Sequence, residues 1–484
     1  MPQSDKILED NPSYRNITYK FIFSENYQQD FLIRLDDKTL DIQQTPKETY
    51  PEWTKLKCHQ CSNCPLDNKK HEYCPIAANI TDLVDFFSKP LDYEDVKLYV
   101  ETPERTYVKT TDYQSAARSL LGIYMVTSGC PVMDKLRPMA LYHLPLASTF
   151  ETTYRSLTNY LIAQFLINQQ GKEPDWDFKN LKTIYENIKT VNSHFRKRLQ
   201  TNSPQNYALN ALSLLDSSAY DPNLSLSPDT FETFENLLLK DALEEKTTSE
   251  EAAIVYHYQF RCENNTIKEF PLRLERKTLN LINTPKNSSP EWTELKCSKC
   301  SNCPLDENEH KYCPAAIGIS EIIEFFKETI SVQKTQITVK TAERDYVRDS
   351  IETTNGISSL MGLIMASSGC PIISRLKPLV RNHLPFSTFN ETVYRVLGMY
   401  LLSQYFKGKS GEEPDWTLKD FSNLYEEINI VNKFFCSRLR SAKIEDASLN
   451  ALVKLDCFAQ MINFTISDKQ VKKFQQLYKA YLED

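Results

Sequence analysis

The 484-residue sequence predicts an α+β fold made of two tandem homologous copies. Each copy is expected to be a small antiparallel β layer with a cysteine-rich metal loop, followed by a helical bundle. Two observations lead to this prediction. Landmarks of the first half recur 239 or 240 residues later, as Cys58 does at Cys297 and Cys130 does at Cys370. Within each half, apolar residues first alternate and then recur at every third or fourth position, which is the change from strand to helix periodicity.

The repeat is clearest around the cysteines. Residues 57–75 read KCHQCSNCPLDNKKHEYCP and residues 296–314 read KCSKCSNCPLDENEHKYCP, identical at 13 of 19 positions. The motifs SGCP, HLP, ETxYR and EPDW also occur once in each half. We therefore assign copy one to residues 15–243 and copy two to residues 254–484, and expect the two to pack pseudo-symmetrically. The joint is expected at residues 244–253, which are mostly charged or polar.

The β layer of copy one is predicted to consist of two hairpins. Residues 17–23 and 31–35 are alternating runs rich in Ile, Phe and Tyr that flank the polar segment SENYQQ, a pattern typical of a hairpin. Residues 96–100 and 106–110 predict a second hairpin that turns at Pro103.

Helices are expected between and after the hairpins. One should start at Thr81, because Thr81-Asp82 offers a side-chain cap and an acidic first-turn residue, and its counterpart should start at Ser320. Helical spacing of apolar residues then continues through residues 117–126, 153–167 and 181–199. The core is expected to contain equivalent apolar pairs: Trp53 and Trp292, Phe86 and Phe325, Leu161 and Leu401.

A cluster of cysteines gives each copy a candidate metal site. The spacing CxxCxxCxxxxxxHxxC lets tight turns aim thiolates at one point, and the SGCP motif adds a fifth cysteine. The candidate ligands are Cys58, Cys61, Cys64, Cys74 and Cys130 in copy one, and Cys297, Cys300, Cys303, Cys313 and Cys370 in copy two. His71 and His310 fall within the motif but are interpreted as solvated loop histidines.

The spacing leaves the bound species open. A closed structural zinc site is the first interpretation, since clustered cysteines in a reduced cytosol usually bind metal. A [4Fe–4S] cluster is the alternative, because the first three cysteines match the opening of the bacterial ferredoxin spacing, and Cys64, Cys74 and Cys130 each precede a proline. Free or redox-active thiols, or copper, remain further possibilities.

A third hypothesis is that the protein is a thiol-dependent enzyme that uses Cys130. Gly129 is suited to end one helix and Pro131 to begin the next, so Cys130 is expected at a helix N-terminus, where the thiolate is favoured. It could then be a metal ligand, a buried structural thiol or a nucleophile in both copies, paired with His143 or His383 only if the intervening helix breaks. The sequence does not decide whether the protein is an enzyme.

Two other motifs are given structural interpretations. In EPDW, Asp175 is expected to cap a helix and Trp176 to pack beneath it. Arg105 and Arg344 lie on predicted hairpin strands and are interpreted as cross-strand charge partners.

Composition excludes several classes of partner. With 57 Lys and Arg against 64 Asp and Glu the net charge is −7, and no Lys/Arg-rich block is present, so nucleic acid and anionic membranes are not expected partners. No apolar run reaches the length of a membrane span, and residues 1–12 lack the apolar stretch of a signal peptide, so a cytoplasmic location is expected. A protein partner is possible.

The combination CSNCPLD, HxYCP, SGCP and HLP with a following ETxYR helix resembles an uncharacterised bacterial domain family of unknown function. The resemblance covers both copies and implies a bacterial, cytosolic protein. It implies no activity. The function predicted from the residues is therefore cysteine-coordinated metal binding, with one site in each copy.

Overall fold

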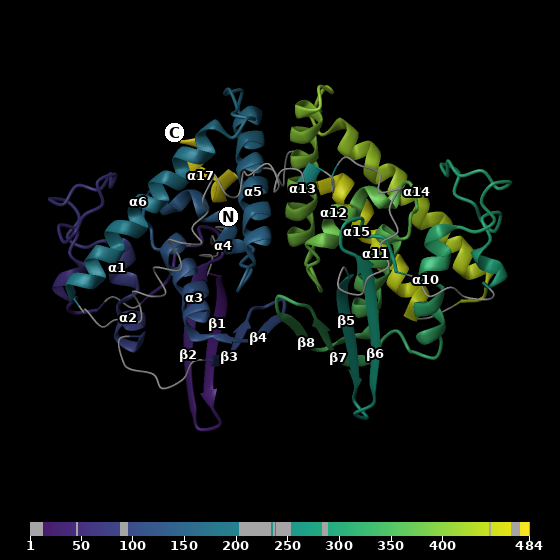
Figure 1. Cartoon of the computed structure of the whole chain (residues 1–484), viewed down its shortest axis with the longest axis horizontal. Helices are drawn as coiled ribbons and strands as arrows, with labels where there is room; N and C mark the ends of the chain where they lie inside the picture. The colour runs from purple at the N-terminus through teal and green to yellow at the C-terminus, as the bar shows by residue number, and fades with distance from the viewer. Residues whose placement is uncertain are drawn as a thin grey trace, which may run out of the picture.

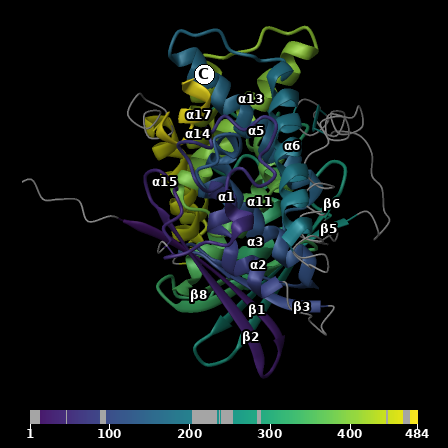
Figure 2. The same ribbon diagram turned by 90° about the vertical axis from the view of Figure 1, so that its left-hand side faces the viewer.

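A computed structural model describes residues 13–44, 47–87, 95–202, 234–235, 238, 253–282, 289–444, 447–465 and 475–483. From the first strand to the helix that ends at Asn202 or Ser441, the two copies have the same order of strands and helices, except that one helix of copy two, Pro314–Phe325, replaces two short helices of copy one. Their helices pack above one shared sheet, with copy one on the left and copy two on the right of Figure 1, and Figure 2 shows the same arrangement from the side. The predicted joint lies outside the described residues except for Ala253, which begins β5.

One antiparallel sheet of eight strands runs through both copies of the described chain, in the order β2-β1-β3-β4-β8-β7-β5-β6. Each predicted hairpin is confirmed, with somewhat longer strands. The strands of copy one are β1 (Tyr14–Ser24), β2 (Tyr27–Asp36), β3 (Asp95–Glu101) and β4 (Thr106–Asp112). Those of copy two are β5 (Ala253–Cys262), β6 (Ile267–Glu275), β7 (Lys334–Lys340) and β8 (Asp345–Glu352).

The helices cover one face of this sheet (Figure 1). Copy one has α1 (Pro75–Asn79), α2 (Thr81–Phe87), α3 (Tyr113–Thr127), α4 (Pro138–Leu141), α5 (Thr149–Gln169) and α6 (Lys179–Asn202). Copy two has α10 (Pro314–Phe325), α11 (Thr353–Ser367), α12 (Lys377–Arg381), α13 (Phe389–Lys409), α14 (Lys419–Ser441), α15 (Ala447–Thr465) and α17 (Lys479–Leu482). Short 3-10 turns at Met133–Leu136 and Ile373–Leu376 precede α4 and α12.

The predicted helix start at Thr81 is confirmed, whereas the one at Ser320 is wrong. In copy two, α10 begins at Pro314 directly after Cys313 and runs straight through Ser320, because proline at the first position starts the helix earlier. In copy one α2 does begin at Thr81, but α1 precedes it, and the Thr81 hydroxyl donates to the Ala78 carbonyl instead of capping an N–H group.

The expected long helix from Pro131 to His143 is also absent. The chain forms a turn at Cys130, then the 3-10 turn and the short helix α4, since Pro138 removes a backbone donor in mid-segment. The core predictions hold for Trp53, Phe86, Leu161 and Leu401, which are buried. Phe325 is exposed and Trp292 only half-buried, so the burial of these two differs from that of their counterparts.

A reciprocal pair of ion pairs joins the copies. Arg105 lies in the connection between β3 and β4. It donates to Glu391 at the start of α13, with nitrogen–oxygen distances of 2.7 and 2.6 Å. Arg344 donates in the same way to Glu151 of α5, at 2.9 and 2.5 Å. Both arginines are buried, so the interpretation as cross-strand partners is wrong. A strand pattern locates a residue on its strand but does not reveal that its long side chain crosses to the other copy.

The helices α5 and α13 lie side by side at the centre of the molecule (Figure 1). Their close approach depends on Gly398 of α13, where an added Cβ would lie 2.7 Å from the Cβ of Thr158 on α5. Farther along, Trp176 and Trp416 stack across the boundary with centroids 3.9 Å apart. Asp175 accepts the N–H of Asn180 at 2.7 Å and so caps α6, as predicted, but the stacking of the tryptophans was not foreseen.

Gly398→Ala is expected to destabilise the protein by about 1–3 kcal/mol, because the new methyl group would overlap Thr158 in a packed helix contact. Urea unfolding measures the change. Gly122→Ala is the matched control, since Gly122 lies within α3 and no atom would contact its Cβ. The control should be stabilised by about 0.5–1 kcal/mol through helix propensity. Equal effects at both positions would contradict the described packing of α5 on α13.

The C-terminal helix of copy two packs on copy one. Figure 1 shows α17, in yellow, among the copy-one helices at the left. The Tyr478 hydroxyl donates to Asn159 of α5 at 2.9 Å, and Lys172 donates to the Leu482 carbonyl at 2.5 Å. The chain end therefore ties the two copies together beyond the shared sheet.

Candidate metal centre

The cysteine loop of each copy is built on tight turns at an outer flank of the molecule (Figure 1). In copy one, the Cys64 N–H donates to the Cys61 carbonyl at 3.0 Å, which closes the CxxC turn. An isolated bridge between Lys55 and Tyr73 brings the two ends of the loop together. Cys74 then occupies the position before α1, and its N–H donates to Thr54. These hydrogen bonds hold the loop in shape without a bound ligand.

Four thiols of each copy come together. In copy two, one cavity is lined by Cys300, Cys303, Cys313 and Cys370. In copy one, the charges that act on the Cys61 thiol come from the equivalent residues Cys74, Cys130 and Cys64. The SGCP cysteine, which is more than 50 residues downstream of the loop, therefore joins the loop cysteines in both copies.

Other candidate ligands stand apart. In copy two, Cys297 is not among the residues that line the cavity. His71 and His310 are exposed, and the His71 ring contacts only the Asp67 carbonyl, at 3.3 Å. In copy two, four of the five candidate cysteines thus line one cavity.

The remaining lining of the copy-two cavity is apolar apart from one residue. Three prolines follow Cys303, Cys313 and Cys370, and Leu295, Leu305, Ala315, Ile372, Val431 and Phe435 complete the wall with Arg438. Such a wall excludes water, which raises the energy of any thiolate that lacks a cationic partner. The cavity is suited to a bound group that neutralises thiolate charge.

Burial raises the thiol pKa values. The pKa of Cys61 rises to about 12 and that of Cys130 to about 11, in both cases first because of burial. The pKa of Cys300 likewise rises to about 12. The helix-start argument had favoured a thiolate at Cys130, but burial outweighs the backbone donors there. A thiol with a raised pKa is a poor nucleophile without a metal or a cation.

Backbone N–H groups nevertheless point at two sulfurs in each copy. Cys74 accepts from Ile76 and Ala77 at the start of α1, and Cys130 accepts from Val132 and Met133. The equivalent thiols of copy two, Cys313 and Cys370, also have two backbone donors each. These bonds lower the thiol pKa and would stabilise a sulfur that carries negative charge.

A buried arginine beside each cysteine group was missed in the sequence analysis. Arg198 of α6 is 1% exposed, and its guanidinium donates to the carbonyls of Trp53 and Lys55 at 2.6 and 2.7 Å. Its positive charge acts on the thiols of Cys61 and Cys74. Arg438 holds the same place in copy two. Both lie in the regular helical runs of α6 and α14, so only their recurrence at offset 240 could have drawn attention to them.

The four thiols of copy two line one cavity. Zinc binds cysteine sulfur at about 2.3 Å, so four zinc ligands lie about 3.8 Å apart. In the described part of the chain, no three His, Cys, Asp or Glu side chains come close enough together to hold a single ion. The arrangement thus provides four thiols around a cavity and leaves open which group fills it.

An open cleft of about 710 Å³ adjoins the cysteine group of copy one. It reaches Pro65 and Pro131, the residues that follow Cys64 and Cys130, and extends to Lys135 and Asn187. In copy two, the positions equivalent to Lys135 and Asn187 are Arg375 and Glu427, which form an ion pair. The surroundings of the two cysteine groups therefore differ although the groups themselves repeat.

Fold and site together define a two-copy α+β protein with neighbouring cysteines in each copy, four of which line one pocket in copy two. The chain belongs to the family described as a domain of unknown function, DUF6901, whose model matches residues 17–236 and 254–479. No curated protein and no solved structure matches the chain. None of the helices in the described segments combines the length and the apolar character required to cross a lipid bilayer.

Proposed function

We propose that each copy binds one [4Fe–4S] cluster through Cys61, Cys64, Cys74 and Cys130 in copy one and through Cys300, Cys303, Cys313 and Cys370 in copy two. The observation that carries the proposal is that four thiols of copy two line one apolar cavity, while no three candidate ligand side chains of the described residues lie close enough together to hold a single ion. In a cubane cluster each thiolate binds a different iron, so the four sulfurs stay farther apart than around zinc.

Three further features support a cluster. The thiolate-bound cluster carries net negative charge, and the buried Arg198 and Arg438 supply positive charge beside it. The N–H groups that point at Cys74 and Cys130 are the kind of donors that tune cluster potentials. A proline follows three of the four cysteines in each copy. Zinc, the first interpretation of the sequence, has less support from this geometry.

The proposed role is redox chemistry or electron transfer in the cytoplasm. In copy one the open cleft reaches within one residue of Cys64 and Cys130, so a small molecule or a partner in the cleft would lie next to the cluster. In copy two the Arg375–Glu427 ion pair occupies the equivalent place, which suits a cluster that stores or relays an electron.

Protein purified without oxygen tests the proposal. A broad absorbance near 400 nm, bleached by dithionite, is expected if the pockets hold clusters, whereas a zinc protein is colourless. A colourless preparation that also fails to develop the band after anaerobic reconstitution with iron and sulfide would refute the proposal.

Arg198→Met is expected to lower the reduction potential of the copy-one cluster, since a nearby positive charge favours the more negative reduced state. Arg198→Lys, which keeps the charge, is the matched control and should retain a potential near that of the wild type. Both variants should lose about 3 kcal/mol of stability, because neither retains the arginine bonds to several carbonyls. Redox titration monitored by absorbance separates the two effects. Equal potentials in both variants would contradict the charge role of Arg198.

A further inference from the structure

A second enclosed site lies where the two copies meet. A cavity of about 60 Å³, here called the central cavity, is lined by equivalent residues of both copies, including Arg155 with Arg395 and His143 with His383. A single ordered water needs about 10–15 Å³, so the central cavity has room for a molecule of a few heavy atoms. None of its lining residues is a cysteine, which makes it independent of the proposed cluster sites.

The charges around the central cavity do not cancel. Its two carboxylates, Glu151 and Glu391, are each held by an arginine of the other copy, Arg344 and Arg105. Each of these two ion pairs therefore carries no net charge. Every other lining side chain is apolar, neutral or an arginine. The net charge of the lining therefore depends on the two arginines that remain.

Arg155 and Arg395 are those arginines. The Arg155 guanidinium donates to the carbonyls of Met139 and Tyr142 at 2.8 and 2.7 Å. Arg395 donates to the carbonyls of Leu379 and Asn382 at 3.1 and 2.5 Å. Neither forms an ion pair with any of the described residues. Carbonyls orient a guanidinium but carry no net charge, so two positive charges remain uncompensated at a partly buried site.

The other polar groups of the central cavity add no positive charge. Burial lowers the pKa of His143 to about 3 and that of His383 well below its usual value, so both rings are neutral near pH 7. The Nε2 atoms of these rings bond Tyr19 and Tyr258, at 2.5 and 2.7 Å. The hydroxyl of Tyr154, a residue that is 5% exposed, has no hydrogen-bond partner among the described residues. It is a free donor at the wall of the cavity.

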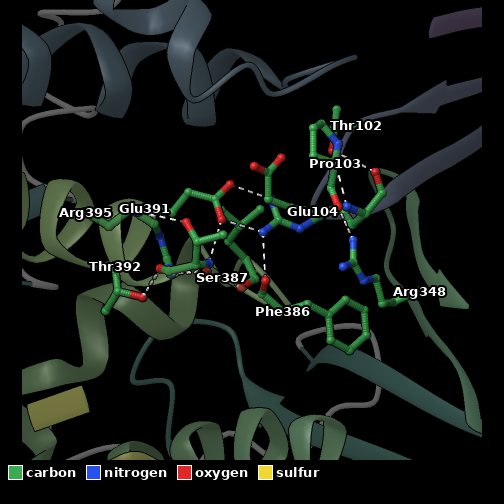
Figure 3. Close-up of polar contacts among 12 residues, drawn as sticks. Thr102, Pro103, Glu104, Arg348, Phe386, Ser387, Glu391, Thr392 and Arg395 are labelled. Carbon is green, nitrogen blue, oxygen red and sulfur yellow. Dashed lines mark hydrogen bonds and ion pairs between the residues drawn. The ribbon is translucent and has the colours of Figure 1, made fainter. Parts of the chain in front are cut away.

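The central cavity adjoins an open cleft. An open cleft of about 520 Å³ shares His383, Leu384 and Arg395 with it. Figure 3 shows Glu391 and Arg395 on α13, close to Ser387 and opposite the Thr102–Glu104 turn of copy one. Arg395 therefore lines both the open cleft and the central cavity.

We propose that the central cavity binds a small dianionic oxyanion, of the class of inorganic phosphate, sulfate or a short dicarboxylate. The guanidinium groups of Arg155 and Arg395 would be its charge partners and the Tyr154 hydroxyl an added donor. Two positive charges match a dianion, and planar guanidinium groups suit paired oxygens. Because one arginine comes from each copy, the ligand would bridge the two halves and stabilise their association.

Calorimetric titration of the full chain, freed of phosphate and sulfate, tests the proposal at pH 8 with inorganic phosphate, sulfate and succinate as separate probes. At least one probe is expected to bind with about one site per chain. Arg155→Met and Arg395→Met should each weaken that binding by about tenfold or more, and Tyr154→Phe by less. Arg375→Met, which removes an exposed arginine of an ion pair outside the cavity, is the matched control and should bind as the wild type does.

Two results would overturn the proposal. One is the absence of binding by all three probes at about 10 mM. The other is binding that persists unchanged in the arginine variants. If an arginine variant fails to fold, Tyr154→Phe still tests the proposal, because this substitution removes only a hydroxyl group. An unchanged affinity for the probe in Tyr154→Phe would then contradict the proposed site.

Discussion

Glu391→Gln is expected to lower the free energy of unfolding by about 3–5 kcal/mol. The substitution keeps the acceptor that bonds the Thr388 N–H but removes the charge opposite Arg105, whose side chain is 1% exposed. An unpaired buried guanidinium is costly because it has left water without gaining a counter-charge. Urea unfolding followed by circular dichroism measures the loss.

Two further variants show whether burial of the pair is the cause. Glu427→Gln disrupts an ion pair whose side chains are about 45% exposed, so it should cost under about 1 kcal/mol. The double variant Arg105→Met, Glu391→Met should recover a large part of the loss, since no buried charge is then left alone. A loss no greater at Glu391 than at Glu427 would contradict the described interface.

The same pairs predict how stability depends on pH. Burial raises the pKa of Glu391 and Glu151, but the ion pairs with Arg105 and Arg344 and the cap hydrogen bonds outweigh it, so both folded-state pKa values lie below the usual one. A carboxyl group with a lowered pKa stabilises the fold above its unfolded pKa of about 4.3. That stabilisation is lost as the pH falls through the folded value. The melting temperature should therefore fall on acidification below about pH 4, and less so in Glu391→Gln.

Cys61→Ser is expected to remove about half of the bound iron and sulfide from the protein. The copies carry separate sets of thiols, so the loss of one ligand empties copy one and leaves copy two filled. Because the binding energy of such a group is also folding energy, the melting temperature should fall together with the iron content. Metal analysis and calorimetry on one preparation measure both quantities.

Cys58→Ser is the matched control for this variant. It makes the same chemical change three residues away in the same loop, at a thiol outside the proposed ligand set. It should retain full iron content and stability. Cys130→Ser should resemble Cys61→Ser, and Cys370→Ser should produce the same coupled loss in copy two. If Cys58→Ser loses iron and Cys61→Ser does not, the ligand set is wrong.

The repeated architecture could be predicted because local signals agree with it. Alternating apolar residues predicted both hairpins, and the recurrence of every motif predicted two like units. What the sequence could not provide is how the units join. The pairing of β4 with β8, the Arg105–Glu391 contact and the packing of α17 on α5 connect residues that are far apart in the chain. No periodic pattern encodes such contacts.

The sequence predicted that the cysteines cluster, but it did not predict the geometry of the cluster. Spacing identified ten cysteines, but it could not predict that Cys370 lies with three loop cysteines around one cavity. Spacing also cannot separate thiols that meet at a point from thiols around a cavity, which is the difference that favours a cluster over zinc. The helix-start argument at Cys130 overlooked burial, which raises the pKa of that thiol to about 11.

The most direct test of the account is quantitative analysis of iron, acid-labile sulfide and zinc in the full chain purified without oxygen. Two [4Fe–4S] clusters predict about eight irons and eight sulfides per chain, with little zinc. A content of about two zinc ions per chain with no sulfide would contradict the account and return the site to the closed zinc centre first expected from the sequence.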